Sequence, residues 1–224
     1  MADKPHYNVL IATPGLNFSN AYVRNLIETT AFLSSKNISW KFLNHYSSLV
    51  AVAREMTLND GYADSQYVGD GQYTYDKIFW IDSDIGWEIE DFLKILSSDK
   101  DVISGVYPVV FKNKAAILKE KTFNFNLLSP SHFESNAAEP ERIWACGMGF
   151  MCMKSGIVES IEKPWFWHPY IEMNDEEGNI IHRRNPSEDI GFCEKINNAG
   201  FEIWMDPSVK LKHYKDVGFE IGMA

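Results

Sequence analysis

The sequence predicts an α/β fold with a mostly parallel central sheet flanked by helices and a smaller, irregular β region. In the first half of the chain, short apolar runs alternate with segments whose apolar residues recur every three or four positions. This alternation is typical of strands joined by helices and favours βαβ units, which build a parallel sheet. In the second half, short apolar runs are separated by long polar stretches, which indicates the less regular region.

The elements of the first half follow from this periodicity. Pro14-Gly15 ends the first apolar run, and Ser19 is a plausible cap for the helix that follows. Ser47 or Ser48 is expected to cap the next helix. The stretch 61–75 is rich in Gly, Asp, Tyr and Gln and is expected to be a loop. The expected strands are 7–13, 38–43, 78–81 and 102–106, and the expected helices are 19–35, about 48–59 and 88–96.

The second half contains one clear helix, at 187–198. Ser187 can cap it, and Gly200 follows its last residues as a normal stop signal. Short strands are expected around 115–118, 122–125 and 150–153, with an alternating strand near 210–214. No repeat or linker divides the chain, so one domain over residues 1–224 is predicted.

Composition excludes some classes of protein. The net charge of −10 disfavours generic binding to nucleic acids or anionic membranes, although the cluster His182-Arg183-Arg184 leaves a local basic patch open. The three cysteines, Cys146, Cys152 and Cys193, lie in apolar sequence and are expected to be buried, reduced thiols. The sequence has no apolar leader and no run of membrane-spanning length, so we expect a cytoplasmic protein without a transmembrane segment.

Asp82-Ser83-Asp84 is the most informative local feature. It directly follows the apolar run 77–81, so the two carboxylates are expected at the carboxyl edge of the sheet, where open α/β sheets bind ligands. Two carboxylates at i and i+2 can share one divalent cation and the phosphates that it carries. Such pairs also occur in ordinary surface turns. Trp80 and Trp87 flank the pair, where a sugar or a base could pack.

Other candidate residues are distributed along the chain. Gly147 and Gly149 permit a close backbone approach to a ligand, or simply form a turn. Glu188 and Asp189 begin a helix, where the helix dipole favours carboxylates, and one of them could be a general base.

His213 and Arg54 are the remaining two candidate residues. His213 could complete the coordination of a metal, although a lone histidine is usually a surface or core residue. Arg54, on the second helix, could reach a nucleotide or point to solvent.

These motifs, in this order, resemble the GT-A glycosyltransferases, especially the family-two-like inverting enzymes and their compact viral and bacterial relatives. The resemblance covers most of the chain, and it implies the Rossmann-like GT-A fold. The glycine loop departs from the commoner glycine pair. The matching segments are Ile11-Ala12-Thr13-Pro14, Phe79-Trp80-Ile81-Asp82-Ser83-Asp84, Ser104-Gly105-Val106-Tyr107-Pro108, Cys146-Gly147-Met148-Gly149, Ser187-Glu188-Asp189, Ala199-Gly200-Phe201, Pro207 and His213.

The resemblance implies a metal-dependent transfer of a sugar from a nucleoside-diphosphate sugar, most simply a UDP- or GDP-sugar, to an acceptor hydroxyl. It divides the chain into a donor-binding half, 1–108, and an acceptor-binding and catalytic half, 109–224. Asp189 is the expected base, with Glu188 the second choice. The expected donor-binding residues are Thr13, Pro14, Arg54, Asp82, Ser83, Gly105 and Gly147, and the expected ligands of Mn²⁺ or Mg²⁺ are Asp82, Asp84 and His213.

Within this ligand set, Asp84 and His213 are the expected direct ligands, and Asp82 either contacts the ribose or acts through water. Retaining enzymes carry a similar acidic helix, so the stereochemistry stays open, with inversion expected. The acceptor also stays open between a glycan, a lipid-linked sugar, a protein and a modified DNA base such as a hydroxymethylpyrimidine. Two other functions remain: a metal-dependent nucleotidyltransferase, disfavoured because 13–17 has no phosphate-binding lysine, and a non-catalytic sugar-binding protein with a degenerate transferase fold.

Overall fold

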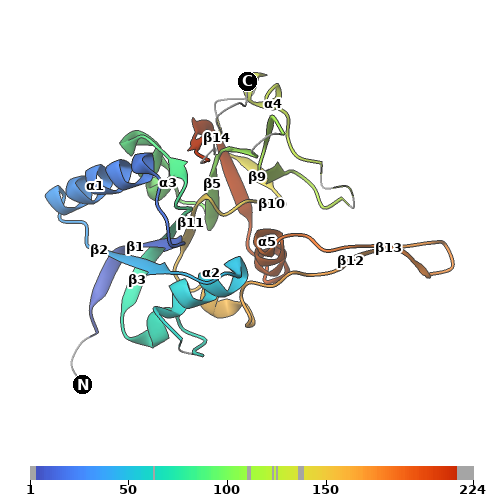
Figure 1. The fold of residues 1–224 in the computed structure, drawn as a ribbon, viewed down its shortest axis with the longest axis horizontal. Helices are drawn as coiled ribbons and strands as arrows, with labels where there is room; N and C mark the ends of the chain where they lie inside the picture. The colour runs from blue at the N-terminus through green and yellow to red at the C-terminus, as the bar shows by residue number, and fades with distance from the viewer. Residues whose placement is uncertain are drawn as a thin grey trace, which may run out of the picture.

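A seven-stranded central sheet organises the molecule (Figure 1). The computed structural model describes residues 4–62, 64–109, 112–122, 124, 126–135 and 139–215. The strand order is β2–β1–β3–β11–β5–β14–β9, and all strands except β11 and β9 run in the same direction. The strands are β1 (His6–Pro14), β2 (Trp40–His45), β3 (Thr74–Ile81), β5 (Val102–Val106), β9 (Glu141–Ile143), β11 (Phe150–Lys154) and β14 (Ile203–Lys210). The predicted fold class, a mostly parallel sheet flanked by helices, is confirmed.

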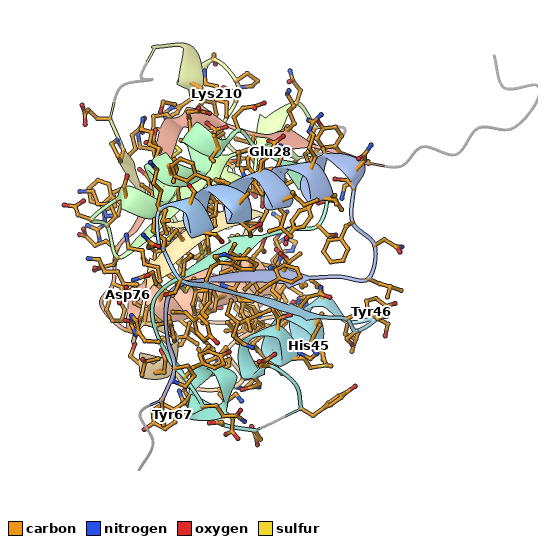
Figure 2. The ribbon with its side chains drawn as sticks, turned by 90° about the vertical axis from the view of Figure 1, so that its left-hand side faces the viewer. Glu28, His45, Tyr46, Tyr67, Asp76 and Lys210 are labelled. Carbon is orange, nitrogen blue, oxygen red and sulfur yellow. The ribbon has the colours of Figure 1, made fainter. Side chains whose placement is uncertain are left out.

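Helices cover both faces of this sheet because its strands bury alternate residues on opposite sides. Val9 and Ile11 of β1 pack with α1 and α3, whereas Leu10 and Ala12 pack on the side of α2 and α5. Figure 2 shows α1, which carries Glu28, on one side of the strands and α2 on the other. The helices are α1 (Asn20–Ser35), α2 (Val50–Asn59), α3 (Ile89–Ser97), α4 (His132–Ser135) and α5 (Glu188–Asn198), with short 3₁₀ turns at Val68–Gly71 and Val158–Ser160.

The first half of the chain follows the predicted order of elements, and the differences are local. The hydroxyl of Ser19 accepts a hydrogen bond from the Tyr22 N–H (3.1 Å) and caps α1 as predicted. The predicted cap of α2 is wrong, because Leu49 precedes the helix and provides no side-chain cap. The Ser47 hydroxyl instead accepts from the Leu49 N–H two residues ahead (3.3 Å), a local turn that competes with capping.

The second half differs more from the sequence-based prediction. The long strand β14 was missed except near its end, because Asp206 and Pro207 interrupt its apolar pattern. Pro207 is tolerated there because the register of β14 against β5 shifts between Met205 and Lys210. The predicted strand at 122–125 includes Phe123 and Phe125, which lie outside the described residues.

In the described part of the chain, eight short strands surround the central sheet in four antiparallel pairs. The pair β12–β13 forms an exposed hairpin that projects from the body and leads back into α5 (Figure 1). The pair β4–β15 brings the end of the described chain against the turn after β3. The short strands are β4 (Ile85–Gly86), β6 (Pro108–Val109), β7 (Lys114–Ala115), β8 (Ile117–Leu118), β10 (Ala145–Cys146), β12 (Ile171–Asn174), β13 (Ile180–Arg184) and β15 (Lys212–His213).

Two further expectations concern the cysteines and the membrane. Cys146, Cys152 and Cys193 are buried and form no disulfide, as predicted. Within the described ranges, no helix has both the length and the apolar character needed to cross a bilayer.

Candidate active site

The acidic turn lies at the carboxyl edge of the sheet, directly after β3. Residues 78–81 of β3 are fully buried, and the chain leaves the core at Asp82. The Asp82 N–H donates to the carbonyl of Gly149, which directly precedes the neighbouring strand β11 (3.0 Å). The Ile85 N–H donates to the Asp82 carbonyl (3.0 Å). These bonds fix the backbone of the turn, so both carboxylates project from one edge.

The sheet pair β4–β15 brings His213 to this turn. His213 is opposite Ile85 in the register, and the Tyr214 N–H donates to the Asp84 carbonyl (2.8 Å). His213 Nε2 lies 3.3 Å from Asp84 Oδ2, and its Nδ1 lies 2.9 Å from the Pro108 carbonyl oxygen. A residue near the end of the described chain therefore contacts the second aspartate of the acidic turn.

Asp84 also contacts Lys215, whose ammonium donates to the same oxygen, Oδ2. Partial burial acts to raise the pKa of Asp84, but the hydrogen bonds from His213 and Lys215 outweigh it and leave this pKa below its ordinary value. The hydrogen bond to Asp84 correspondingly raises the pKa of His213. Asp84 is therefore an anion at neutral pH, in contact with the Lys215 ammonium and the His213 imidazole.

Asp84 and His213 fit a divalent cation. A carbonyl oxygen only accepts, so His213 Nδ1 carries a proton toward Pro108, and Nε2, once it gives up the proton that it donates to Asp84, can present its lone pair to a cation beside that carboxylate. Carboxylate oxygen and imidazole nitrogen together suit Mn²⁺. In the described part of the chain, no three His, Cys, Asp or Glu side chains are grouped as metal ligands. The protein thus offers two direct ligands here, and ligand oxygens or water would supply the others.

Arg54 holds the other aspartate. It lies on α2 with 3% of its surface exposed, and its Nη2 contacts Asp82 Oδ1 (3.1 Å) while its Nε contacts Glu188 Oε1 (3.2 Å). The guanidinium carbon lies 5.5 Å from the centroid of the Trp80 ring. One cation thus ties the acidic turn to the first residue of α5. Sequence reasoning had placed Arg54 at the nucleotide and did not identify these contacts.

Asp189 is half-buried in the first turn of α5, next to Glu188. Ser187 precedes α5 as predicted, but its hydroxyl donates to the Asp189 carboxylate and does not cap the helix. The Ile190 N–H also donates to Asp189 (2.8 Å). Burial, followed by the charge of Glu188, raises the pKa of Asp189 to about 6, despite the opposing effects of Ser187, Arg54 and the Ile190 N–H.

Two cavities meet at Asp189. The larger, of about 540 Å³, contains the acidic turn, His213, Arg54 and the ends of β1 and β2. The smaller, of about 290 Å³, is lined by the glycine loop and by the segment between β13 and α5. Asp189 lines both cavities, together with Val109 and Ala116. Asp189 therefore borders both the cavity that contains the candidate cation site and the smaller cavity beside it.

The glycine loop makes room for a side chain of this protein. The Gly149 N–H donates to the Tyr107 hydroxyl oxygen (2.9 Å). A Cβ built on Gly147 would lie 2.0 Å from that oxygen, and one on Gly149 would lie 2.7 Å from the ring. Tyr107 lines the larger cavity, and its ring lies 5.6 Å from that of His213. The glycines thus support the cavity wall through Tyr107, although Gly147 also lines the smaller cavity.

Gly147→Ala is therefore expected to destabilise the protein by about 1 to 3 kcal/mol, because Tyr107 must move to admit the methyl group. Urea denaturation measures the loss. The double variant Gly147→Ala/Tyr107→Phe removes the hydroxyl that the methyl would meet, and it should recover part of the loss relative to the sum of the single variants. A Gly147→Ala variant as stable as the wild type would contradict this packing.

Several predicted site residues lie away from the cavities. Thr13 is fully buried with Oγ1 2.6 Å from the Tyr22 hydroxyl, and a Cβ on Gly105 would meet the core side chain of Val209 at 2.8 Å. Pro14 and Ser83, in contrast, line the larger cavity. The side chain of Thr13 and the backbone of Gly105 thus help to pack the ends of β1 and β5 in the core.

The aromatic side chains also divide between core and surface. Trp80 and Trp87, expected beside a ligand, are 0% and 3% exposed and pack in the core, so that expectation is wrong. Trp87 Nε1 donates to Thr29 (3.0 Å). Trp167 and Tyr170, near the β12–β13 hairpin, are 56% and 68% exposed.

The basic cluster lies on the β13 strand. Arg183 pairs with Glu172 across the hairpin (2.9 Å), whereas Arg184 lines the smaller cavity.

Sequence reasoning missed Tyr107 and Lys215 as site residues. Tyr107 belongs to the matching segment 104–108 but was not selected as a site residue, and Lys215 lies two positions after His213. That proximity was the available signal, but it does not show which side chains turn toward the cavity.

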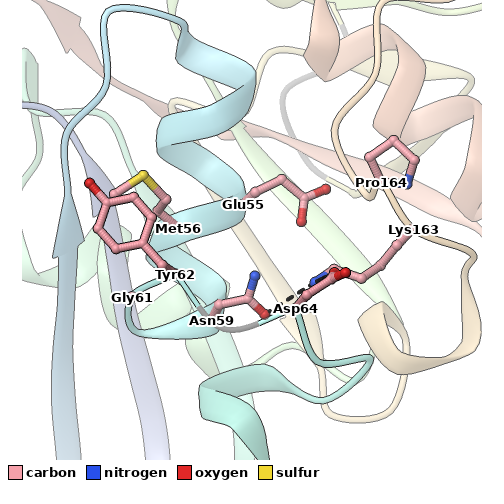
Figure 3. A pocket seen from close by; sticks show the side chains of 8 residues that line it. All are labelled: Glu55, Met56, Asn59, Gly61, Tyr62, Asp64, Lys163 and Pro164. Atoms are coloured by element: carbon pink, nitrogen blue, oxygen red, sulfur yellow. Dashed lines mark hydrogen bonds and ion pairs between the residues drawn. The ribbon is translucent and has the colours of Figure 1, made fainter.

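Another cavity of about 540 Å³ lies on the far side of α2 and contains none of the predicted site residues (Figure 3). Figure 3 shows Glu55 and Lys163 among its lining side chains. The Lys163 ammonium donates to Asp64 Oδ1 (3.3 Å) and to Asn59 Oδ1 (3.4 Å). Glu55 follows Arg54 in the chain, so α2 separates this cavity from the one that Arg54 lines. The candidate chemistry belongs to the cavity of Asp84 and His213.

No protein-family model and no curated protein sequence matches the chain. The chain is similar in structure to A197 from STIV, at 18% identity and a TM-score of 0.53, over 93% of this chain and 86% of that one. It is also similar to GalNAc-T7, crystallised with UDP, GalNAc and Mn²⁺, at 10% identity and a TM-score of 0.57, over 97% of this chain and 45% of that one.

A third similar structure is the catalytic domain of Drosophila β1,4-galactosyltransferase 7 in complex with xylobiose. It is 11% identical with a TM-score of 0.50, and the match covers 94% of this chain and 71% of that one. These identities show the fold and nothing finer. GalNAc-T7 and β1,4-galactosyltransferase 7 are glycosyltransferases by name, and the chain has the GT-A-like fold that its motifs predict.

Proposed function

We propose that the protein is a metal-dependent glycosyltransferase that moves a sugar from a nucleoside-diphosphate sugar to an acceptor hydroxyl, with inversion. The observation that carries the proposal is the position of Asp189 between the two cavities. The donor would bind in the larger cavity, built mainly by residues 1–108, and the acceptor in the smaller one, built by 109–224. The structure of GalNAc-T7 with UDP, GalNAc and Mn²⁺ supports the choice of a nucleotide donor and a metal.

In this proposal, Asp84 and His213 hold Mn²⁺ or Mg²⁺ against the diphosphate. The cation supplies positive charge where negative charge develops on the leaving diphosphate. The imidazole ligand favours Mn²⁺, because Mg²⁺ prefers oxygen ligands. Asp82 already contacts Arg54, so we assign it to the ribose or to a water-mediated contact. Pro14, Ser83 and the end of β2 supply the remaining walls of the donor cavity.

Asp189 is the better candidate for the base. Glu188 is 6% exposed and paired with Arg54, so its carboxylate is committed to a structural contact. Asp189 is half-buried and faces both cavities. As the acceptor oxygen attacks the anomeric carbon, Asp189 takes the hydroxyl proton, and the bond from that carbon to the diphosphate oxygen breaks. Attack from the face opposite the leaving group inverts the anomeric centre.

The pH profile follows from the raised pKa of Asp189, about 6. A base acts only when ionised, so transfer at saturating Mn²⁺ and donor should be half-maximal near this pKa and fall about tenfold for each lower pH unit. Initial rates between about pH 4.5 and about pH 8 measure this limb. A carboxylate with the ordinary aspartate pKa of about 3.9 would instead keep the rate constant down to about pH 5.

A donor screen tests the proposed function. UDP-, GDP-, CMP- and dTDP-sugars are incubated with the full chain, with and without Mn²⁺, and sugar release is measured. We expect hydrolysis of at least one nucleoside-diphosphate sugar that disappears with chelator and in the Asp84→Asn variant. No turnover of any donor, combined with sugar binding that is insensitive to Mn²⁺, would instead identify a non-catalytic sugar-binding protein.

A further inference from the structure

One oxygen of the Asp84 carboxylate contacts two side chains. Oδ2 lies 3.3 Å from His213 Nε2 and also accepts from the Lys215 ammonium. This carboxylate is also the one that the proposed metal site requires. The other aspartate of the turn, Asp82, is already paired with Arg54. A cation at this site must therefore share Asp84 with an ammonium group or displace it.

We infer that Lys215 is an internal competitor of the divalent cation for Asp84. The inference rests on the proposed function, because it takes Asp84 and His213 as the metal ligands. With no cation bound, the ammonium neutralises the carboxylate. When the cation binds, electrostatic repulsion and the loss of its acceptor move Lys215 away. Lys215 thus lowers the affinity of the Asp84–His213 site for the divalent cation, and it keeps this site compact when no cation is bound.

The geometry allows this exchange without moving the backbone. Tyr214, the neighbour of Lys215, is held by the bond from its N–H to the Asp84 carbonyl (2.8 Å), and β15 is paired with β4. The Lys215 side chain is 46% exposed, and its ammonium lies at the end of a flexible four-carbon stem. It lines both the donor cavity and an adjacent one of about 650 Å³, which is bordered by Asn17, Ser19 and other residues at the start of α1. Rotation of the stem therefore takes the ammonium from Asp84 into a wide, solvated space.

Mn²⁺ binding to the full chain tests the competition. Free Mn²⁺ is quantified by electron paramagnetic resonance during titration of protein that has been stripped with EDTA and then desalted. Lys215→Ala should bind Mn²⁺ about twofold to fivefold more tightly than the wild type, the range expected for a partly exposed ion pair. Lys215→Arg keeps the charge and should stay near the wild type. Lys212→Ala, which removes a lysine of β15 three residues before Lys215, controls for general loss of positive charge.

Thermal unfolding gives a second readout that a merely structural lysine would not produce. In EDTA, Lys215→Ala should melt about 1 to 3 °C below the wild type, because Asp84 loses a counter-charge. In saturating Mn²⁺ the two proteins should melt at the same temperature, because the cation has replaced the ammonium in both. A purely structural contact would lower the melting temperature equally under both conditions.

The outcomes separate this inference from the proposed function. Equal or weaker Mn²⁺ binding by Lys215→Ala, with binding still abolished by Asp84→Asn, overturns the competition and leaves the metal site intact. Tighter binding by both Lys215→Ala and Lys212→Ala reduces the effect to overall charge and also overturns it. If neither the wild type nor Lys215→Ala binds Mn²⁺, the metal site itself fails, and the inference fails with it.

Discussion

Replacing Asp189 with Asn is expected to lower sugar transfer by about a hundredfold to ten-thousandfold, the usual contribution of a positioned base. The amide oxygen of Asn can still accept from Ser187 and from the Ile190 N–H, so the start of α5 should be preserved. It cannot take a proton from the acceptor. The measurements are the transfer rate at saturating donor and the affinity for the donor nucleotide, which should change by less than about twofold.

Glu194→Gln is the matched control for this variant. Glu194 lies on the same helix and is paired with Lys121 at the surface (2.5 Å), away from both cavities. Its neutralisation should leave transfer close to the wild-type rate. If Asp189→Asn retains more than about a tenth of the wild-type rate, the proton is removed by another group and Asp189 is not the base.

Replacing Arg54 with Met is expected to destabilise the fold by about 3 to 5 kcal/mol, because breaking a buried ion pair leaves uncompensated buried charge. Asp82 and Glu188 would both lose the cation that they share, and Glu188 is 6% exposed. Urea denaturation at neutral pH gives the free energy of unfolding. Arg54→Lys should be intermediate, because one ammonium cannot reproduce the two separate contacts of the guanidinium.

Arg142→Met is the control, because it removes an arginine whose side chain is 62% exposed and whose partner, Glu202, is 46% exposed. Its effect should stay within about 0.5 kcal/mol. If Arg54→Met costs less than about 1 kcal/mol, the two carboxylates do not depend on this guanidinium. The connection between the acidic turn and α5 would then have to come from the surrounding core.

The order of strands and helices in the first half could be predicted because it is encoded locally. The unbroken burial of residues 9–14 in β1 and the hydrogen-bonded cap at Ser19 are properties of a few neighbouring residues. The position of Asp82-Ser83-Asp84 at a strand end is of the same kind. The strand β14 escaped prediction because Pro207 is compatible with it only through a register shift against β5, which is a tertiary feature.

The contacts of the site were harder to predict because residue type does not reveal which way a side chain faces. Trp80 looked like a stacking platform, yet it is buried against Arg54. The glycine loop suggested a ligand, yet Tyr107 fills the space beside it. The contact of His213 with Asp84 was expected only through a shared metal, which imidazole chemistry allows and the resemblance implies, since no local pattern connects these two segments. The assignment of both residues as metal ligands stays a prediction.

The most direct measurement of the central claim is the position of Mn²⁺ in crystals of the full chain grown with MnCl₂ and UDP. Anomalous diffraction locates the ion independently of the protein atoms. We expect a peak within about 2.5 Å of both an Asp84 carboxylate oxygen and His213 Nε2, with diphosphate oxygens completing the coordination. A crystal in which UDP is bound and the only manganese peak lies more than about 5 Å from both groups would contradict it.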